Sequence, residues 1–209
     1  MKKRLGLVIT TLLSLGLCFS CAQQPPTAIT PVVVLPALTD IPQFSLPLTV
    51  PQAYRSIPHK RTEFAPLYSD IPEQEKAYLA LMFSLIDQAI ALRVSTLQEF
   101  QGRNYNPNRI DEYQVLIDFT NTIQPPANLS TYHEQIRLAL QAQQSFYTDW
   151  RTKGSSFSAG HNGIRNHPQV KAASSQLIAA HSTLVQTYPQ EDSLNKDAFF
   201  DYHCALDFI

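Results

Sequence analysis

The sequence predicts an all-α fold, a bundle of four to five helices preceded by a proline-rich extended tether. Three observations lead to this prediction. After position 72, apolar residues recur at steps of three and four, which is the spacing of one helix face. The same part of the chain shows no alternation of apolar and polar residues long enough for a strand. Ten of the fifteen prolines stand in residues 22–72, where they favour extended backbone.

Composition excludes several classes of protein. The 209 residues include 16 Lys+Arg and 17 Asp+Glu, so the formal net charge of −1 provides no positive field to attract nucleic acid. Three cysteines are too few for a disulfide scaffold. A 44% share of apolar residues with little net charge can form a core, which excludes a wholly disordered chain. The chain has no run of about 20 apolar residues, so a multi-pass membrane protein is not expected.

Residues 1–20 are expected to be an export signal. Lys2, Lys3 and Arg4 form a short basic start, and a mostly apolar stretch follows from Leu5 to Leu17. This stretch is too short to cross a bilayer, but it fits the apolar region of about 7–15 residues in a signal peptide.

The end of this segment, Cys18-Phe19-Ser20-Cys21, resembles the lipobox of bacterial prolipoproteins, in which a small residue directly precedes a cysteine. The resemblance implies removal of residues 1–20 and lipid attachment, such as palmitate, at Cys21. Cys18 departs from the usual pattern, since leucine is commonest there. Because no Asp follows the cysteine, the resemblance implies the periplasmic side of the outer membrane if the host is Gram-negative. Ordinary secretion and an uncleaved anchor are the alternatives.

Processing at this point would change the charge and the cysteine content. Three basic residues and no acid would leave, so the mature chain would carry 13 basic and 17 acidic residues, a net charge of −4. Cys18 would leave with the signal and Cys21 would carry lipid. Cys204 would then be the sole cysteine thiol in the mature chain.

The tether is assigned to residues 21–71. It contains no glycine, and its prolines predict an extended segment without helix. Because the segment is also rich in apolar side chains, we expect residues 22–30 to form a tether in solvent and part of residues 31–70 to lie along the folded domain. A disordered stalk throughout is one alternative. Another is that Val32–Leu35 forms a short edge strand or binds a partner.

The first helix is expected from Pro72 to Gly102. Pro72 suits the first turn, and Glu73 and Glu75 lie where the helix dipole favours negative charge. Apolar residues occupy more than one face of this helix, since several lie off the main stripe: Leu79, Phe83 and Leu92. Such a helix is central to its domain or faces a partner.

The next two helices have clear start and stop signals. The second begins at Asn106-Pro107 and ends before the next pair of prolines. The third begins at Asn128 or Ser130, both of which can cap a helix, and ends at Gly154, which suits the position after the last turn.

The last two helices complete a domain of residues 72–209. The fourth starts at Pro168 and ends before Pro189, and a fifth is expected over residues 194–208. A domain of this length can bury about two-thirds of its unfolded surface.

The connection over residues 154–167 is a candidate contact site. It holds three of the six glycines, together with His161, Arg165 and His167. Glycines and an arginine at a helix N-terminus can receive an anion, so these three side chains are the predicted ligand or anion contacts. A plain mobile loop is the alternative, and a serine with histidine but no evident acid is only a weak sign of catalysis.

The densest polar group in the sequence is Asp201-x-His203-Cys204-x-x-Asp207. A thiol beside histidine suggests a nucleophile or a metal ligand. Adjacent residues of a helix point about 100° apart, however, so His203 cannot readily serve Cys204 as a base. We therefore expect Cys204 to be buried for structural reasons, with redox chemistry, metal chemistry or an intermolecular disulfide as alternatives.

The six histidines raise the question of a metal or haem site. The motifs of covalent haem, of zinc proteases and of di-iron bundles are all absent from the sequence. Three histidines lie inside predicted helices, namely His133, His181 and His203. No catalytic residue, metal ligand or cofactor is predicted.

The function expected from these observations is that of an exported, lipid-anchored protein of the bacterial cell envelope. Its helical domain would be a binding or accessory module and not an enzyme. The membrane, through the lipid, and another envelope protein are the expected partners, and nucleic acid is not one. One alternative is a periplasmic bundle that binds a ligand, a metal or haem through His133, His181 or His203. Another is an enzyme built on residues 154–167 or Cys204.

Overall fold

The computed structural model describes residues 34–58, 60–102, 104–153 and 161–208. They all belong to one compact unit, Val33–Ile209. The expected signal of residues 1–20, the expected lipid site at Cys21 and the tether of residues 22–30 lie outside the described residues.

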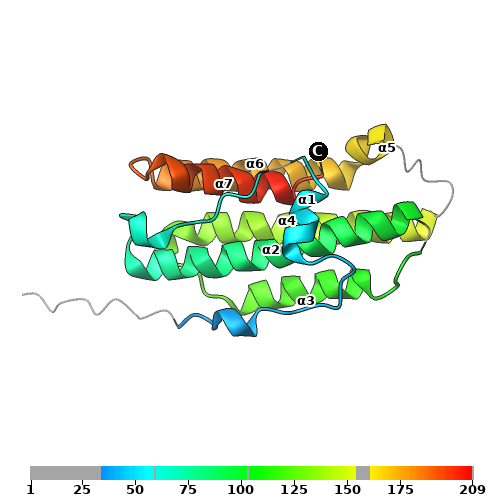
Figure 1. Cartoon of the computed structure of the whole chain (residues 1–209), viewed down its shortest axis with the longest axis horizontal. Helices are drawn as coiled ribbons and strands as arrows, with labels where there is room; N and C mark the ends of the chain where they lie inside the picture. The colour runs from blue at the N-terminus through cyan, green and yellow to red at the C-terminus, as the bar shows by residue number, and fades with distance from the viewer. Residues whose placement is uncertain (1–33, 59, 103, 154–160, 209) are drawn as a thin grey trace, which may run out of the picture. The chain divides into compact units, whose positions relative to one another are not determined.

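An all-α fold is confirmed. The described residues contain helices and no strand (Figure 1). Five long helices occupy the expected places: α2 (Glu73–Gly102), α3 (Arg109–Thr122), α4 (Ser130–Lys153), α6 (Pro168–Thr187) and α7 (Ser193–Leu206). Two short α-helices and three 3₁₀ helices accompany them: α1 (Val50–Arg55), α5 (His161–Asn166), η1 (Leu38–Asp40), η2 (Pro66–Tyr68) and η3 (Ala127–Leu129).

The prediction that residues 22–72 contain no helix is wrong for α1. Pro51 stands in the first turn of α1, where a missing N–H is no loss. The side chain of Gln52 accepts a hydrogen bond from the backbone N–H of Thr49 at 2.8 Å, which caps the helix start. Ala53 and Tyr54 are buried, so packing stabilises a helix that would be too short to persist alone.

The second difference is α5. Six residues of the connection between α4 and α6 are helical, and α5 packs on α6. The rest of that connection, residues 154–160, lies outside the described residues.

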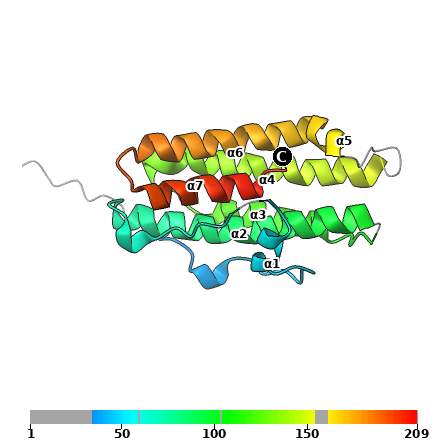
Figure 2. The same cartoon turned by 45° about the horizontal axis from the view of Figure 1, so that its top comes forward.

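The five long helices form a closed ring. α2, α3, α4, α6 and α7 contact one another in that order, and α7 closes the ring against α2 (Figures 1 and 2). Each helix runs opposite to the one before it. Because the number of helices is odd, α7 runs parallel to its neighbour α2 (Figure 2).

Large aromatic side chains fill the interior of the ring. The fully buried ones come from α2, α3, α4 and α7: Tyr78, Phe83, Tyr113, Tyr132, Phe146, Tyr147 and Phe199. Many of these rings touch, as where Phe83 stacks on Tyr202 with centroids 4.5 Å apart. Aromatic residues bury more area than any others, which suits the wide space that five helices enclose.

α2 is buried on nearly every face, as its apolar pattern predicts. Sixteen of its residues between Tyr78 and Thr96 are buried. By length and hydropathy alone α2 could cross a membrane, but 72% of its most apolar window is buried inside the protein. The structure therefore uses α2 as the core helix of a bundle.

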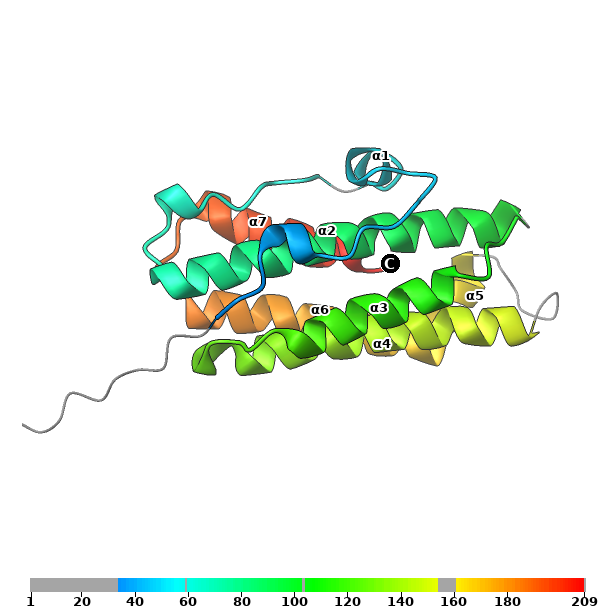
Figure 3. The ribbon, with the colours of Figure 1, turned by 90° about the horizontal axis from the view of Figure 1, so that it is seen from below.

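The outer side of α2 is covered by the N-terminal strap, which we define as the described residues 34–58 and 60–71. Figure 3 shows the strap, with α1, running along α2. Its apolar residues Ile41, Ala53, Tyr54 and Ile71 are buried in the same core as the helices. The strap is part of the folded unit.

Polar contacts fasten the strap to two helices. Asp87 of α2 accepts hydrogen bonds from the hydroxyl of Tyr54 at 3.1 Å and from the guanidinium of Arg61 at 2.7 Å. Asn195 of α7 pairs with the backbone of Ala65: its side-chain oxygen accepts from the N–H at 2.8 Å, and its amide donates to the carbonyl at 3.3 Å. Burial raises the pKa of the Asp87 carboxyl, and this effect exceeds the lowering of the pKa by the hydrogen bond and charge of Arg61.

Arg109 at the start of α3 ties together three parts of the chain. Its buried guanidinium donates to Glu99 of α2 and to Glu112 of α3, each at 2.8 Å. It also donates to the backbone carbonyl of Ser45 in the strap at 3.2 Å. A buried cation shared by two carboxylates is hard to replace, because both carboxylates are largely shielded from water.

Removing Arg109 tests this tie. We expect Arg109→Met to lower the free energy of unfolding by about 3–5 kcal/mol, since two largely desolvated carboxylates lose their cation. Arg137→Met is the matched control, because Arg137 pairs with Glu134 at the surface of α4, and it should cost less than about 1 kcal/mol. Urea unfolding of the two variants measures both values. Equal costs would show that the Arg109 cluster is no stronger than a surface pair.

Candidate functional site

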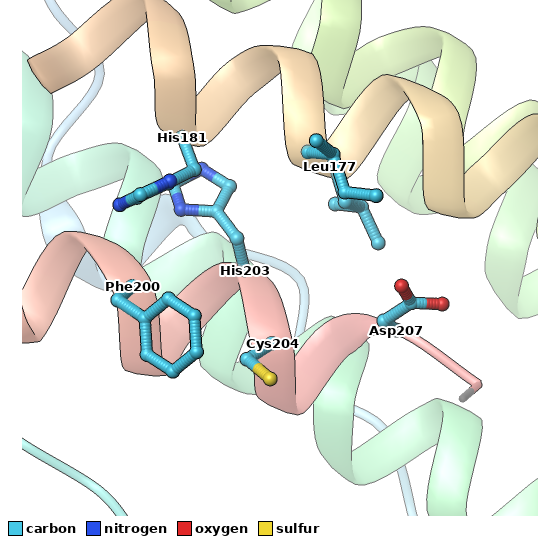
Figure 4. A pocket seen from close by; sticks show the side chains of 7 residues that line it. Leu177, His181, Phe200, His203, Cys204 and Asp207 are labelled. Atoms are coloured by element: carbon cyan, nitrogen blue, oxygen red, sulfur yellow. The ribbon is translucent and has the colours of Figure 1, made fainter.

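A cavity of about 180 Å³ lies between α6 and α7. Figure 4 shows the side chains that face it from both helices. Seven of the described residues line it: Leu177, Ile178, His181, Phe200, His203, Cys204 and Asp207.

Both ends of α7 are fixed, so the cavity has a defined shape. At the start, the carboxylate of Asp192 accepts hydrogen bonds from the backbone N–H groups of Leu194 and Asn195, at 2.6 and 3.1 Å. These bonds, the one from Asn195 first, lower the pKa of Asp192. At the other end, Asp207 accepts from the hydroxyl of Ser174 on α6 at 2.5 Å, which joins the two helices.

His203 forms the deepest polar part of the cavity. The side chain is 3% exposed, and its Nδ1 is hydrogen-bonded to the carbonyl of Phe199 one turn earlier. A carbonyl oxygen can only accept, so Nδ1 carries the proton. Burial lowers the pKa of His203 to about 4, so the ring is neutral at pH 7 and its Nε2 is a bare acceptor. This Nε2 has no hydrogen-bond partner in the structure.

His181 faces His203 from α6. The two ring centroids are 6.3 Å apart, and Figure 4 shows the rings meeting in the space between the helices. The rings of His181 and Phe200 also pack edge-to-face, with centroids 5.7 Å apart. Partial burial lowers the pKa of His181 as well. Two neutral imidazoles therefore form the polar wall of the cavity.

Cys204 is not activated as a nucleophile. Burial, followed by the charges of Asp207 and Asp201, raises the pKa of its thiol. A thiol held in its protonated form reacts slowly. His203 does not serve it as a base, because Nδ1 is bonded to Phe199 and Nε2 has no partner.

The rim of the cavity is apolar. Ile178 on α6 is 67% exposed and Phe200 on α7 is 52% exposed. Large apolar side chains at the mouth of an apolar cavity are typical of a binding site.

The predicted contacts in residues 154–167 have different surroundings. Arg165 is exposed on α5. His167 is buried and caps α6, with its Nδ1 accepting from the N–H of Gln169 at 3.2 Å. Its Nε2 lies 3.4 Å from a carboxylate oxygen of Asp149, so this side chain faces an acid. The side chain of His161 lies outside the described residues, and the anion site remains a prediction.

His133 has a separate role from the other two helical histidines. Its Nδ1 is hydrogen-bonded to the hydroxyl of Tyr78 at 3.0 Å, and it does not line the cavity. Within the described ranges, no group of three or more His, Cys, Asp or Glu side chains is placed to hold a metal ion. Only His181 and His203 of the three come together.

The sequence singles out the polar residues of the lining as candidates but does not indicate the apolar rim; the polar residues are His181, His203, Cys204 and Asp207. The sequence does contain a sign of this rim, namely two pairs of adjacent large apolar residues, Leu177-Ile178 and Phe199-Phe200. Adjacent residues of a helix point about 100° apart, so a narrow buried face cannot hold both members. In each pair the first residue is buried and the second is exposed.

Comparison of the chain with protein families, with curated proteins and with solved structures gave no significant match.

Acidification tests the buried state of His203. Its pKa is about 4 in the folded protein, against 6.5 for an ordinary histidine. Between these values the unfolded chain binds more protons, so stability is lost as the pH falls through this window. From about pH 7 to about pH 4.5, the unsubstituted chain should lose roughly 2–3 kcal/mol more than His203→Phe.

Urea unfolding across this pH range measures the difference. Leu177→Ala is the control, because it weakens the same packing without removing a titrating group and should keep the pH dependence of the unsubstituted chain. The neighbouring titratable groups of His181, Tyr132 and Asp207 are present in the unsubstituted chain and in both variants. Their own titration therefore does not distinguish the three proteins. The same pH dependence in His203→Phe would contradict the buried neutral imidazole.

Proposed function

We propose that this chain is an exported, lipid-anchored protein of the bacterial cell envelope, with a helical domain that binds a ligand or a partner protein. The anchor rests on one observation, the basic and apolar start followed by Ser20-Cys21. In a Gram-negative host the lipid would lie in the outer membrane, on its periplasmic side.

The length of the connecting chain supports a domain held near the membrane. Val34, the first described residue, stands thirteen positions after Cys21, so twelve residues separate the two. At 3.3–3.6 Å per residue they can reach at most about 45 Å. From Val34 onward the strap is fastened to the bundle, so it adds little further reach.

The α6–α7 cavity supports binding as the role of the domain. It combines an apolar rim, an apolar wall and two neutral histidines, which is the usual make-up of a ligand pocket. Its groups are poorly arranged for catalysis, since Cys204 is held protonated and Asp207 already accepts hydrogen bonds from Ser174 and from the backbone of Phe208. We therefore propose a binding or accessory protein without enzymatic activity.

A periplasmic ligand-binding bundle is the second candidate. The observation that favours it over binding of a partner protein alone is the depth of the cavity, which reaches the fully buried His203. If the domain is such a ligand-binding bundle, the lipid anchor only holds it at the membrane, and the cavity binds the ligand.

Labelling with palmitate in a bacterial host tests the anchor. We expect the unsubstituted chain to incorporate label and Cys21→Ala to incorporate none, because an acyl chain needs the thiol of Cys21. Cys204→Ala is the matched control and should label like the unsubstituted chain. Equal labelling of Cys21→Ala, or no labelling of the unsubstituted chain, would refute the lipid anchor.

A further inference from the structure

We infer that the α6–α7 cavity binds a small uncharged aromatic molecule that donates a hydrogen bond to Nε2 of His203. The inference deepens the binding role proposed above by naming the class of ligand. Size, charge and hydrogen bonding each restrict that class.

The volume of the cavity is large enough for a ligand with one aromatic ring. The cavity measures about 180 Å³, and apolar protein cavities of about 150 Å³ are known to hold benzene. Leu177, Ile178 and Phe200 provide apolar contacts from both helices. The Phe200 ring already packs edge-to-face with an aromatic ring, that of His181, and a planar ligand would find the same kind of neighbour.

Charge excludes an anion. Among the described residues no Lys or Arg lines the cavity, and both imidazoles are neutral. Asp207 is the acidic side chain in the described lining, and it does not favour an anion. An ionised ligand would therefore lose its water without gaining an opposite charge, whereas a neutral ligand avoids that cost.

The hydrogen-bonding group of the cavity requires a ligand that is a donor. Nε2 of His203 is a buried acceptor without a partner, and such a group costs free energy in the empty cavity. The neighbouring hydroxyl of Tyr132 does not satisfy it, because that hydroxyl has no partner either. A ligand hydroxyl or amino group would gain this bond without breaking one between protein groups.

His181 controls access to this acceptor. Nε2 of His203 is shielded from solvent. The ring of His181, on the α6 side of the cavity, has its centroid 6.3 Å from that of the His203 ring (Figure 4). The side chain of His181 is itself partly exposed. The inference therefore requires that the His181 ring turn aside to open a path from the rim to Nε2 of His203.

The test compares phenol with toluene, which has nearly the same shape but no donor. We would use the full chain carrying Cys21→Ser, which cannot be lipidated at that position, so that the result does not depend on the anchor. In ¹⁵N NMR of the imidazoles, phenol should move the Nε2 signal of His203 in a saturable way, and toluene should leave it in place.

A variant adds a second readout. In His203→Phe the affinity for phenol should fall about three- to tenfold relative to that for toluene, which is the range of one hydrogen bond. His133→Phe is the matched control, since His133 is a mostly buried histidine outside the cavity, and it should keep the ratio of the unsubstituted chain. Helical circular dichroism checks that each variant folds, and the NMR test needs no variant.

Any of three outcomes would overturn the inference. The first is that neither compound binds. The second is that phenol binds while the Nε2 signal of His203 stays in place. The third is that His203→Phe keeps the phenol-to-toluene affinity ratio. None of them bears on the lipid anchor, which the palmitate experiment decides by itself.

Discussion

The structure depends on the need to cover α2 on every side. A helix that is apolar around most of its circumference cannot leave those faces in water, so it must have neighbours in most directions. α3 and α7 contact its two flanks, the aromatic interior fills its inner side, and the strap covers its outer side. The strap is therefore required by the composition of α2, which explains why a proline-rich segment carries buried apolar residues and specific polar contacts.

The same constraint positions the cavity. α7 must cover α2, and the buried Arg93 of α2 holds it there by donating to the carbonyl of Ala205 at 2.8 Å. Gln143 of α4 donates to the next carbonyl, that of Leu206, at 2.7 Å. Both donors meet the negative end of the α7 dipole, which offsets part of the cost of burying the Arg93 charge. With α7 fixed from this side, its opposite side faces α6 and leaves the cavity between them.

Features that depend on local chemistry could be predicted from the sequence, and features that depend on packing could not. The five long helices were predictable because prolines, capping residues and a three-to-four spacing act within one segment. α1 was not predictable in this way. A proline such as Pro51 usually indicates the absence of helix, and the capping contact of Gln52 becomes visible only in the structure. His181 and His203 were identifiable as candidates, but their meeting depends on how α6 crosses α7. The anion site was inferred from residue types, whereas His167 in fact caps α6 beside Asp149.

The unpaired Nε2 of His203 is hard to explain by stability alone. A phenylalanine or leucine at this position would fill the same space beside Tyr132 and Phe83 without a desolvated acceptor. The bond from Nδ1 to the Phe199 carbonyl does not justify the histidine either, because that carbonyl is also placed to accept within the helix. What the histidine adds is one fixed acceptor at the deep end of an apolar cavity. Such an acceptor lowers the free energy only when a ligand donates a hydrogen bond to it. The histidine at this position is therefore better explained by ligand recognition than by folding.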